Sequence, residues 1–150
     1  MTKQDKLIKH LDSELVGSII SMSHAHDEVT VEIDVSAIKN VMCQLRDQGV
    51  FAFDQLIDVC GVDYLRYGEY DWETEAATEN GFSRAVESQE SRAFVLNKPR
   101  FAVVYHLLST VHNHRLRVKA FIEESHLVVP SVHDIWKCAN WFEREAYDLY

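Results

Sequence analysis

Residues 101 to 108, FAVVYHLL, decide the fold class of this chain of 150 residues. The run is apolar almost throughout, and His106 is its only strongly polar side chain. A short and nearly continuous apolar run predicts a strand that is buried on both faces. Such a strand needs further strands beside it and helices over it, which the flanking segments supply.

The segment that follows, residues 115 to 123 (RLRVKAFIE), alternates between apolar and polar positions after a turn at residues 109 to 114. This alternation predicts a strand with one buried face. The inward residues are Leu116, Val118, Ala120 and Ile122, and the outward residues are Arg115, Arg117, Lys119 and Phe121. In an acidic chain, three basic residues on one strand face suit an acidic protein partner. The alternative is a solvated edge strand that is protected by its charges.

The N-terminal half predicts most of the remaining elements. Its patterns indicate a helix at 3–15, strands at 18–23 and 29–35, a helix capped by Ser36 and ended by Gly49, and a strand-like run at 53–64. In that run, Asp58 and Asp63 are expected to hold a turn through Asx-type bonds or to face a partner. With a C-terminal helix, the order is helix, two strands, helix, three strands, helix. The predicted fold is α+β, a two-layer domain with helices packed on one mixed β-sheet.

Residues 67 to 98 interrupt this order with a different composition. Between Glu69 and Glu90 there are seven carboxylates and one arginine, and neither strand nor helix periodicity persists. This pattern predicts an acidic surface insertion, mobile or only locally folded, within a single domain that spans residues 1–150.

The last twenty residues, SVHDIWKCANWFEREAYDLY from Ser131 to Tyr150, predict a helix that begins near Val132. Pro130 disfavours helix at the residue before it, and Ser131 is a suitable N-cap. Asp134 stands three residues after the cap, where it suits a capping-box-like arrangement and the positive end of the helix.

One face of this predicted helix is apolar and comprises Ile135, Ala139, Phe142 and Ala146, with Cys138 and Leu149 beside it. Arg144 points away from this face, and Glu143 and Glu145 diverge to opposite flanks, so they cannot act as a close carboxylate pair. Trp141 also lies off the apolar stripe, and an aromatic residue beside basic residues is typical of protein interfaces. The helix is therefore expected either to dock a partner or to cover the domain edge with solvated charges.

The composition excludes several classes of function. With 15 basic and 24 acidic residues, the formal charge of −9 argues against nucleic acid or an anionic membrane as the primary partner. Cys43, Cys60 and Cys138 form no C-x-x-C pair and are expected to be buried, reduced thiols. No secretory segment follows Met1 and no apolar run is long enough to span a bilayer, so a soluble cytoplasmic chain is expected.

Candidate chemical sites are weak. His24 and His26, and likewise His112 and His114, have the spacing of metal ligands on a strand, but each pair lies in a predicted turn without a third ligand. The chain has no glycine-rich phosphate loop. The sequence therefore predicts no self-contained catalytic site, and the alternative is a small metal-dependent hydrolase that uses His112, His114 and Asp63.

Four segments carry a family resemblance: LIDVCGVDY (56–64), RFAVVYHLLS (100–109), RLRVK (115–119) and WFEREAYDL (141–149). Their content, order and spacing resemble the C subunit of the proton-pumping NADH:quinone oxidoreductase, the 30 kDa subunit family of respiratory complex I. The E-R-E-x-x-D motif of that family corresponds to Glu143, Arg144, Glu145 and Asp148.

The resemblance implies a structural subunit without a catalytic site or cofactor of its own. It implies that the chain docks the quinone-reducing module beside the D, B and I subunits of complex I, on the cytoplasmic side of the inner membrane, with membrane association only through the complex. FMN, the iron-sulfur clusters and the quinone would belong to partner subunits. The equivalent domain of a membrane-bound hydrogenase or formate hydrogenlyase shares the motif and is an alternative.

The expected partner interface combines the motif with the basic strand and comprises Arg115, Arg117, Lys119, Trp141, Glu143, Arg144, Glu145 and Asp148. Chains of the family continue beyond the position of Tyr150 into a long extended tail. A C-terminally truncated member is therefore expected, with weaker assembly with the D subunit.

Overall fold

The computed structural model describes residues 2–65, 70–72, 77–78, 81–82, 86–88 and 98–149. A five-stranded sheet carries the fold, with the strand order β1-β2-β9-β8-β3. Its strands are β1 (Ile19–Ala25), β2 (Glu28–Ile33), β3 (Gln55–Asp63), β8 (Phe101–Ser109) and β9 (His114–Ile122). β2 and β9 run parallel, whereas the other neighbours run antiparallel, so the sheet is mixed as predicted.

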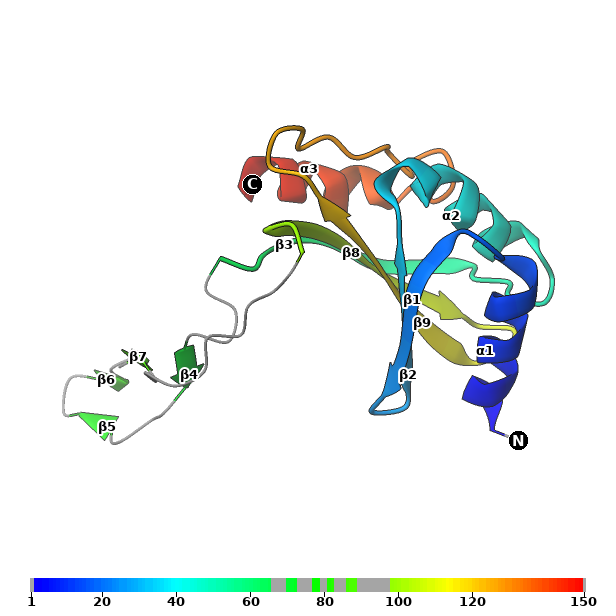
Figure 1. The fold of residues 1–150 in the computed structure, drawn as a ribbon, viewed down its shortest axis with the longest axis horizontal. Helices are drawn as coiled ribbons and strands as arrows, with labels where there is room; N and C mark the ends of the chain where they lie inside the picture. Colours follow the sequence, from blue (N-terminus) through cyan, green and yellow to red (C-terminus); the bar gives the residue numbers. More distant parts are fainter. Residues whose placement is uncertain are drawn as a thin grey trace.

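The helices of the described residues cover one face of this sheet (Figure 1). They are α1 (Lys3–Glu14), α2 (Ile38–Asp47) and α3 (Ala139–Leu149), with a 3-10 turn, η1 (Val35–Ala37), before α2. Their apolar faces and the inward face of the sheet form one hydrophobic core. The predicted α+β, two-layer architecture is confirmed. None of the helices in these ranges is long and apolar enough to cross a membrane.

The two central strands confirm their predicted patterns. In β8 the residues from Ala102 to Tyr105 are all buried, and in β9 the buried residues Leu116, Val118 and Ala120 alternate with more exposed neighbours. β9 lies between β2 and β8 rather than at an edge of the sheet. The alternative of an edge strand protected by its charges is therefore wrong.

The first two helices, which the sequence predicted, present apolar faces to the core. In α1, Leu7 and Leu11 are buried, and Thr2 forms a reciprocal capping box with Asp5. In α2 the buried residues are Ile38, Val41, Met42 and Leu45. Their spacing follows the helical period, which is why the sequence pattern located both helices correctly.

Two predicted boundaries in the N-terminal half are wrong. The first hairpin turn consists only of His26 and Asp27, whose φ angles of 52° and 60° suit a tight two-residue turn, so β1 continues to Ala25. Asp34, not Ser36, caps the turn before α2. The carboxylate of Asp34 accepts hydrogen bonds from the backbone N–H and the hydroxyl of Ser36 at 2.8 and 2.5 Å.

Between β3 and β8 the described residues form two short antiparallel pairs. β4 (Tyr70–Trp72) pairs with β7 (Val86–Ser88), and β5 (Ala77–Thr78) pairs with β6 (Gly81–Phe82). Figure 1 shows these pairs to one side of the five-stranded sheet. Most of the residues to which the predicted mobility of this insertion applies lie outside the described ranges.

Candidate partner interface

The C-terminal helix α3 packs beside β3, at one edge of the sheet (Figure 1). Ala139 is buried, and Phe142 and Ala146 are partly buried, as the predicted apolar stripe requires. Trp141 and Tyr147 instead face solvent, with 71% and 87% of their surface exposed. The helix therefore presents large aromatic side chains outside the core.

α3 begins at Ala139, so the predicted helix start near Val132 is wrong. Residues 131–138 contain turns instead, because long-range contacts hold this segment. Val132 is fully buried, and the indole Nε1 of the buried Trp136 donates a hydrogen bond to the backbone carbonyl of Phe53 at 3.2 Å. These contacts fix the chain in a path that an early helix would not allow.

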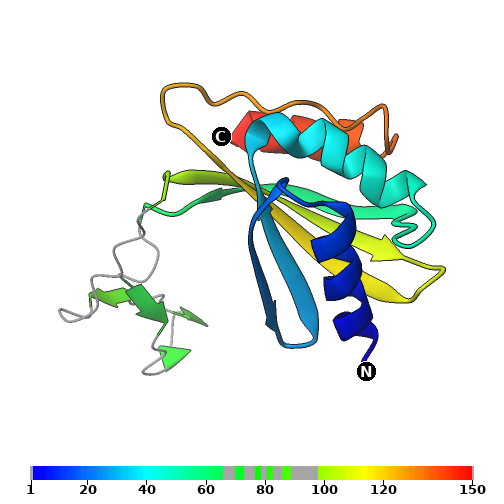
Figure 2. The ribbon, with the colours of Figure 1, turned by 45° about the vertical axis from the view of Figure 1, so that its right-hand side comes forward.

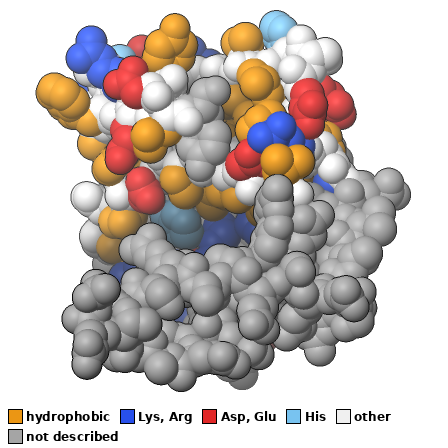
Figure 3. Space-filling view, turned by 90° about the vertical axis from the view of Figure 1, so that its left-hand side faces the viewer, with side chains coloured by type: hydrophobic (Ala, Val, Ile, Leu, Met, Phe, Trp, Pro, Cys, Tyr) orange, Lys and Arg blue, Asp and Glu red, His pale blue; other side chains and the backbone are white. Residues whose placement is uncertain are grey.

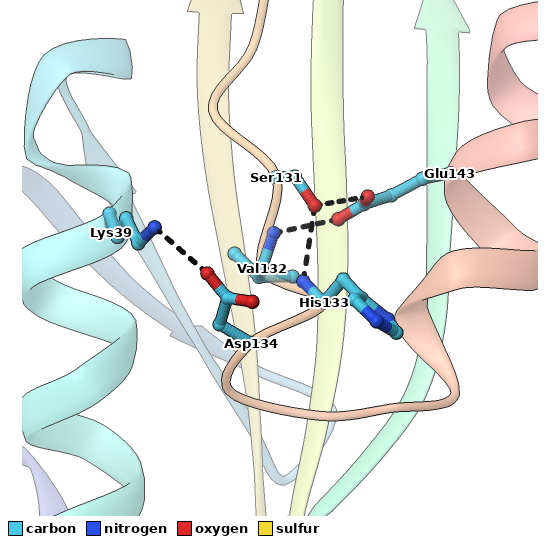
Figure 4. Close-up of polar contacts among 6 residues, drawn as sticks. All are labelled: Lys39, Ser131, Val132, His133, Asp134 and Glu143. Atoms are coloured by element: carbon cyan, nitrogen blue, oxygen red, sulfur yellow. Dashed lines mark hydrogen bonds and ion pairs between the residues drawn. The ribbon is translucent and has the colours of Figure 1, made fainter.

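The two predicted capping residues of this segment make other contacts (Figure 4). The hydroxyl of Ser131 donates a hydrogen bond to Glu143 at 2.6 Å and accepts one from the backbone N–H of His133 at 3.2 Å. The carboxylate of Asp134 pairs with Lys39 Nζ of α2 at 3.2 Å. The capping-box prediction is wrong, because Ser131 binds Glu143 and the backbone of His133, and Asp134 binds Lys39.

Glu143 fastens α3 to the loop that precedes it. Its Oε2 accepts the hydrogen bond from Ser131, and its Oε1 accepts one from the backbone N–H of Val132 at 2.7 Å (Figure 4). Both carboxylate oxygens of Glu143, a predicted interface residue, are thus engaged inside the chain. Burial, with a smaller contribution from the charge of Glu143, also raises the pKa of Tyr105.

The other three motif residues face outward. Arg144, Glu145 and Asp148 are exposed. The guanidinium carbon of Arg144 lies 5.8 Å from the centroid of the Trp141 ring, which is within cation–π range. We call the surface formed by Trp141, Arg144, Glu145 and Asp148 the α3 outer face. It offers an aromatic ring, a cation and carboxylates to a neighbouring molecule.

An apolar groove lies between α3, the inward face of the sheet and the loop before α3. Its volume is about 520 Å³, and its walls include Phe101, Val103, Ile122, Leu127, Pro130 and Tyr147. Figure 3 shows this side of the molecule, where hydrophobic side chains gather near acidic and basic ones. The sequence pattern did not predict the groove, and the apolar run LVVP at 127–130 in a loop was the available signal.

The three basic residues of β9 lie on the opposite side of the sheet from α3. Because the apolar residues of β9 face the helices, Arg115, Arg117 and Lys119 face away from them. The guanidinium of Arg117 pairs with Glu28 of β2 and also lies 3.4 Å from the hydroxyl of Thr30. The structure therefore does not bring the predicted strand patch and the predicted helix patch together into one surface.

Asp63 and Arg100 join the ends of β3 and β8 beside the insertion. The Nε and Nη2 atoms of Arg100 donate to the two carboxylate oxygens of Asp63 at 2.7 and 2.6 Å. Asp63 also accepts a hydrogen bond from the backbone N–H of Leu65 at 2.9 Å, the expected Asx-type bond. These contacts, chiefly the one from Arg100, lower the pKa of Asp63 to about 2. The sequence suggested a turn at Asp63 but not its basic partner.

The residues of the hydrolase alternative do not meet. Asp63 lies opposite Phe101 at the start of β8, whereas His114 lies opposite Ser109 at its end. At about 3.3 Å per residue, the length of the strand separates these positions by roughly 26 Å. The rings of His112 and His114 stack at 5.4 Å, but the described part of the chain has no group of three side chains suited to a metal.

The cysteines differ from one another in exposure. Cys43 and Cys60 are partly buried, but Cys138 is exposed, so the prediction of a buried thiol is wrong there. Cys138 lies just before the start of α3 rather than within it, and its thiol is 3.6 Å from the carbonyl oxygen of Leu56. Burial raises the pKa of Cys60, which disfavours the reactive thiolate form.

Comparison with known sequences decides the family. The family described as the respiratory-chain NADH dehydrogenase 30 kDa subunit matches residues 31–150. The chain belongs to this family. The C subunit of the NADH-quinone oxidoreductase of Legionella pneumophila (strain Corby) is 65% identical over 150 residues, and that of Coxiella burnetii (strain RSA 493) is 45% identical over 151. All of the chain aligns in both cases, and it spans 66% of the length of these relatives.

Solved structures share the fold of this 30 kDa family member. Nqo5, solved as its trypsin-resistant fragment, matches with a TM-score of 0.67 at 22% identity, covering 99% of this chain and 92% of that one. A chain of the membrane-bound sulfane sulfur reductase, an archaeal respiratory membrane complex, matches with the same TM-score at 16% identity, covering 99% and 68%. At these identities the likeness shows the fold alone.

Proposed function

We propose that this chain is a structural subunit of NADH-quinone oxidoreductase that docks the quinone-reducing module and performs no catalysis itself. Membership of the 30 kDa family and the names of the relatives support this assignment. The 65% identity to a C subunit of this enzyme favours it over the equivalent domain of a membrane-bound hydrogenase or formate hydrogenlyase.

The observation that carries the docking role is the exposed aromatic surface of α3 beside an apolar groove. Trp141 and Tyr147 are exposed, and Tyr147 forms part of the groove wall. Aromatic and arginine side chains carry much of the binding energy of protein interfaces, and Arg144 stands against Trp141 here. A partner segment that covered Trp141 and entered the groove would bury both apolar surfaces together.

The proposed partners are the D, B and I subunits of the same enzyme, as the family resemblance implies. FMN, the iron-sulfur clusters and the quinone are held by partner subunits, so electrons pass beside this chain rather than through it. The chain lies peripherally, on the cytoplasmic side of the inner membrane, and is attached to the membrane only through the complex.

The proposal is tested by replacing both exposed aromatics, Trp141→Ala with Tyr147→Ala, and purifying the enzyme from cells in which this chain is the sole C subunit. Loss of the two anchors should reduce the amount of the chain in the purified enzyme by about tenfold or more. Val111→Ala is the matched control, because Val111 is 71% exposed in the β8–β9 turn, away from α3.

Quinone reduction by NADH should fall in proportion to the amount of assembled chain. Unchanged assembly and unchanged quinone reduction in the doubly substituted protein would contradict docking through α3. Full assembly combined with a lost turnover would contradict the non-catalytic role instead.

A further inference from the structure

Strand β1 forms one edge of the five-stranded sheet, next to β2 (Figure 2). Among the described residues, no backbone group pairs with its outer side. An edge of this kind presents N–H and C=O groups that can accept a further strand.

The hairpin register identifies the outward backbone groups. Ala25 lies opposite Glu28 across the two-residue turn, and such flanking residues form a hydrogen-bonded pair. Bonded and non-bonded pairs alternate along an antiparallel ladder, so Ser23 bonds to β2 as well. Met22 and His24 therefore direct their N–H and C=O groups away from β2, at the spacing that an added strand requires.

β1 lacks most of the devices that protect an edge strand. Residues 19–25 (IISMSHA) contain no proline and no charged side chain other than that of a histidine. A register shift between Ile19 and Ser21 protects only the beginning of the strand, and the side chain of Ile20 there is 63% exposed. The opposite edge differs, because β3 carries Asp58 and Asp63 and has α3 packed beside it.

We propose that β1 binds an extended segment of a neighbouring subunit, which adds to the sheet as a further strand. This inference rests on the proposed function, which supplies a neighbouring subunit. A second copy of the chain is disfavoured because each copy carries a formal charge of −9. Strand addition is a general mode of peptide recognition, in which the backbone supplies affinity and alternate side chains supply specificity.

The surroundings of β1 define the chemistry of the added segment. On the face toward the helices, Met22 is partly buried against the core, so an apolar side chain beside it would extend that core. On the other face, Ser21 and Ser23 are small and leave room for a longer side chain. Glu28 and Glu32 of β2 share that face, but Arg117 and Lys98 already pair with them, so they set no charge on the longer side chain.

The decisive measurement is hydrogen exchange of single amides, in the free chain and in purified NADH-quinone oxidoreductase that contains it. The amides of Met22 and His24 should exchange freely in the isolated chain and become at least about tenfold slower in the enzyme. The amide of Ser23, which bonds to β2, should be protected in both states and serves as the internal reference.

A pair of variants tests whether the edge contributes to assembly. Met22→Pro removes an outward N–H without removing a bond of the β1–β2 ladder, whereas Met22→Val keeps the N–H. Met22→Pro should reduce the amount of chain in the purified enzyme by about tenfold, the effect of removing an interface hydrogen bond, and Met22→Val should not. Circular dichroism checks that both variants fold. If Met22→Pro does not fold, hydrogen exchange of the amides of Met22 and His24 in the unaltered chain decides between the outcomes.

The possible results separate this inference from the proposed function. An assembled enzyme in which the amides of Met22 and His24 still exchange freely overturns strand addition and leaves the docking role intact. Protection that already appears in the free chain and grows with its concentration shows a second copy and overturns the inference. An unaltered chain that is absent from the purified enzyme overturns the proposed function and this inference with it.

Discussion

Replacing Glu143 with alanine should destabilise the chain by detaching α3 from the loop before it. The carboxylate accepts hydrogen bonds from the hydroxyl of Ser131 and the backbone N–H of Val132 at 2.6 and 2.7 Å. Each hydrogen bond to a charged group contributes about 1.5–3 kcal/mol, and partial exposure of the site reduces that value. We therefore expect the free energy of unfolding to fall by about 2–3 kcal/mol.

The assay is thermal and urea denaturation followed by circular dichroism. The melting temperature of a domain of this size falls by about 2–4 °C for each kcal/mol of lost stability. That of Glu143→Ala should therefore fall by roughly 5–10 °C. The melting temperature of Glu143→Gln should lie between those of the unaltered chain and Glu143→Ala, because an amide has one accepting oxygen in place of two. Glu145→Ala is the matched control on the exposed side of the same helix, where surface substitutions change stability by about 0.5 kcal/mol or less. Equal stability of Glu143→Ala and Glu145→Ala would refute the assigned role of Glu143.

Trp136→Phe removes a buried hydrogen bond to a backbone carbonyl and should lower the free energy of unfolding by about 1–3 kcal/mol in urea denaturation, whereas Trp141→Phe on the exposed face should not. The pKa of Asp63 is lowered from 3.8 to about 2, so the stabilisation by its carboxylate is present above pH 3.8 and is lost as the pH falls toward 2. Melting temperatures measured over a pH series should show that Asp63→Asn abolishes this part of the acid sensitivity. The pKa of His114 is lowered from 6.5, chiefly by burial, so the unfolded chain binds its proton first and stability should decrease as the pH falls below 6.5. His114→Gln should flatten that decrease, and the exposed His126→Gln should leave it unchanged.

Local periodicity was sufficient to predict most of the fold. The alternating residues of β9, the apolar run of β8 and the stripe of α2 all describe how side chains a few positions apart share a face. Such patterns depend on the geometry of one strand or one helix, so they can be recognised in the sequence. The sheet order could not be recognised in this way, and the central place of β9 overturned its interpretation as an edge strand.

The candidate interface was predicted only in part. The exposure of Trp141 and Arg144 followed from helical spacing and was confirmed. The role of Glu143 was not predictable, because its two hydrogen-bond donors lie 11 and 12 positions earlier, in a loop that was expected to be helical. The groove was missed for a similar reason, since its walls come from β3, β8, the end of β9 with the loop after it, and α3.

The sequence by itself determined the α+β class, the inward faces of the strands and helices, and the resemblance to the 30 kDa family through its E-R-E-x-x-D motif. Only the tertiary structure decided where α3 begins, because Trp136 bonds to a carbonyl 83 positions away and that contact outweighs a local cap. Only the tertiary structure placed the basic residues of β9 and the outer face of α3 on opposite sides of the sheet. Contacts between distant segments depend on how the layers pack, and no local pattern in a single chain encodes that packing.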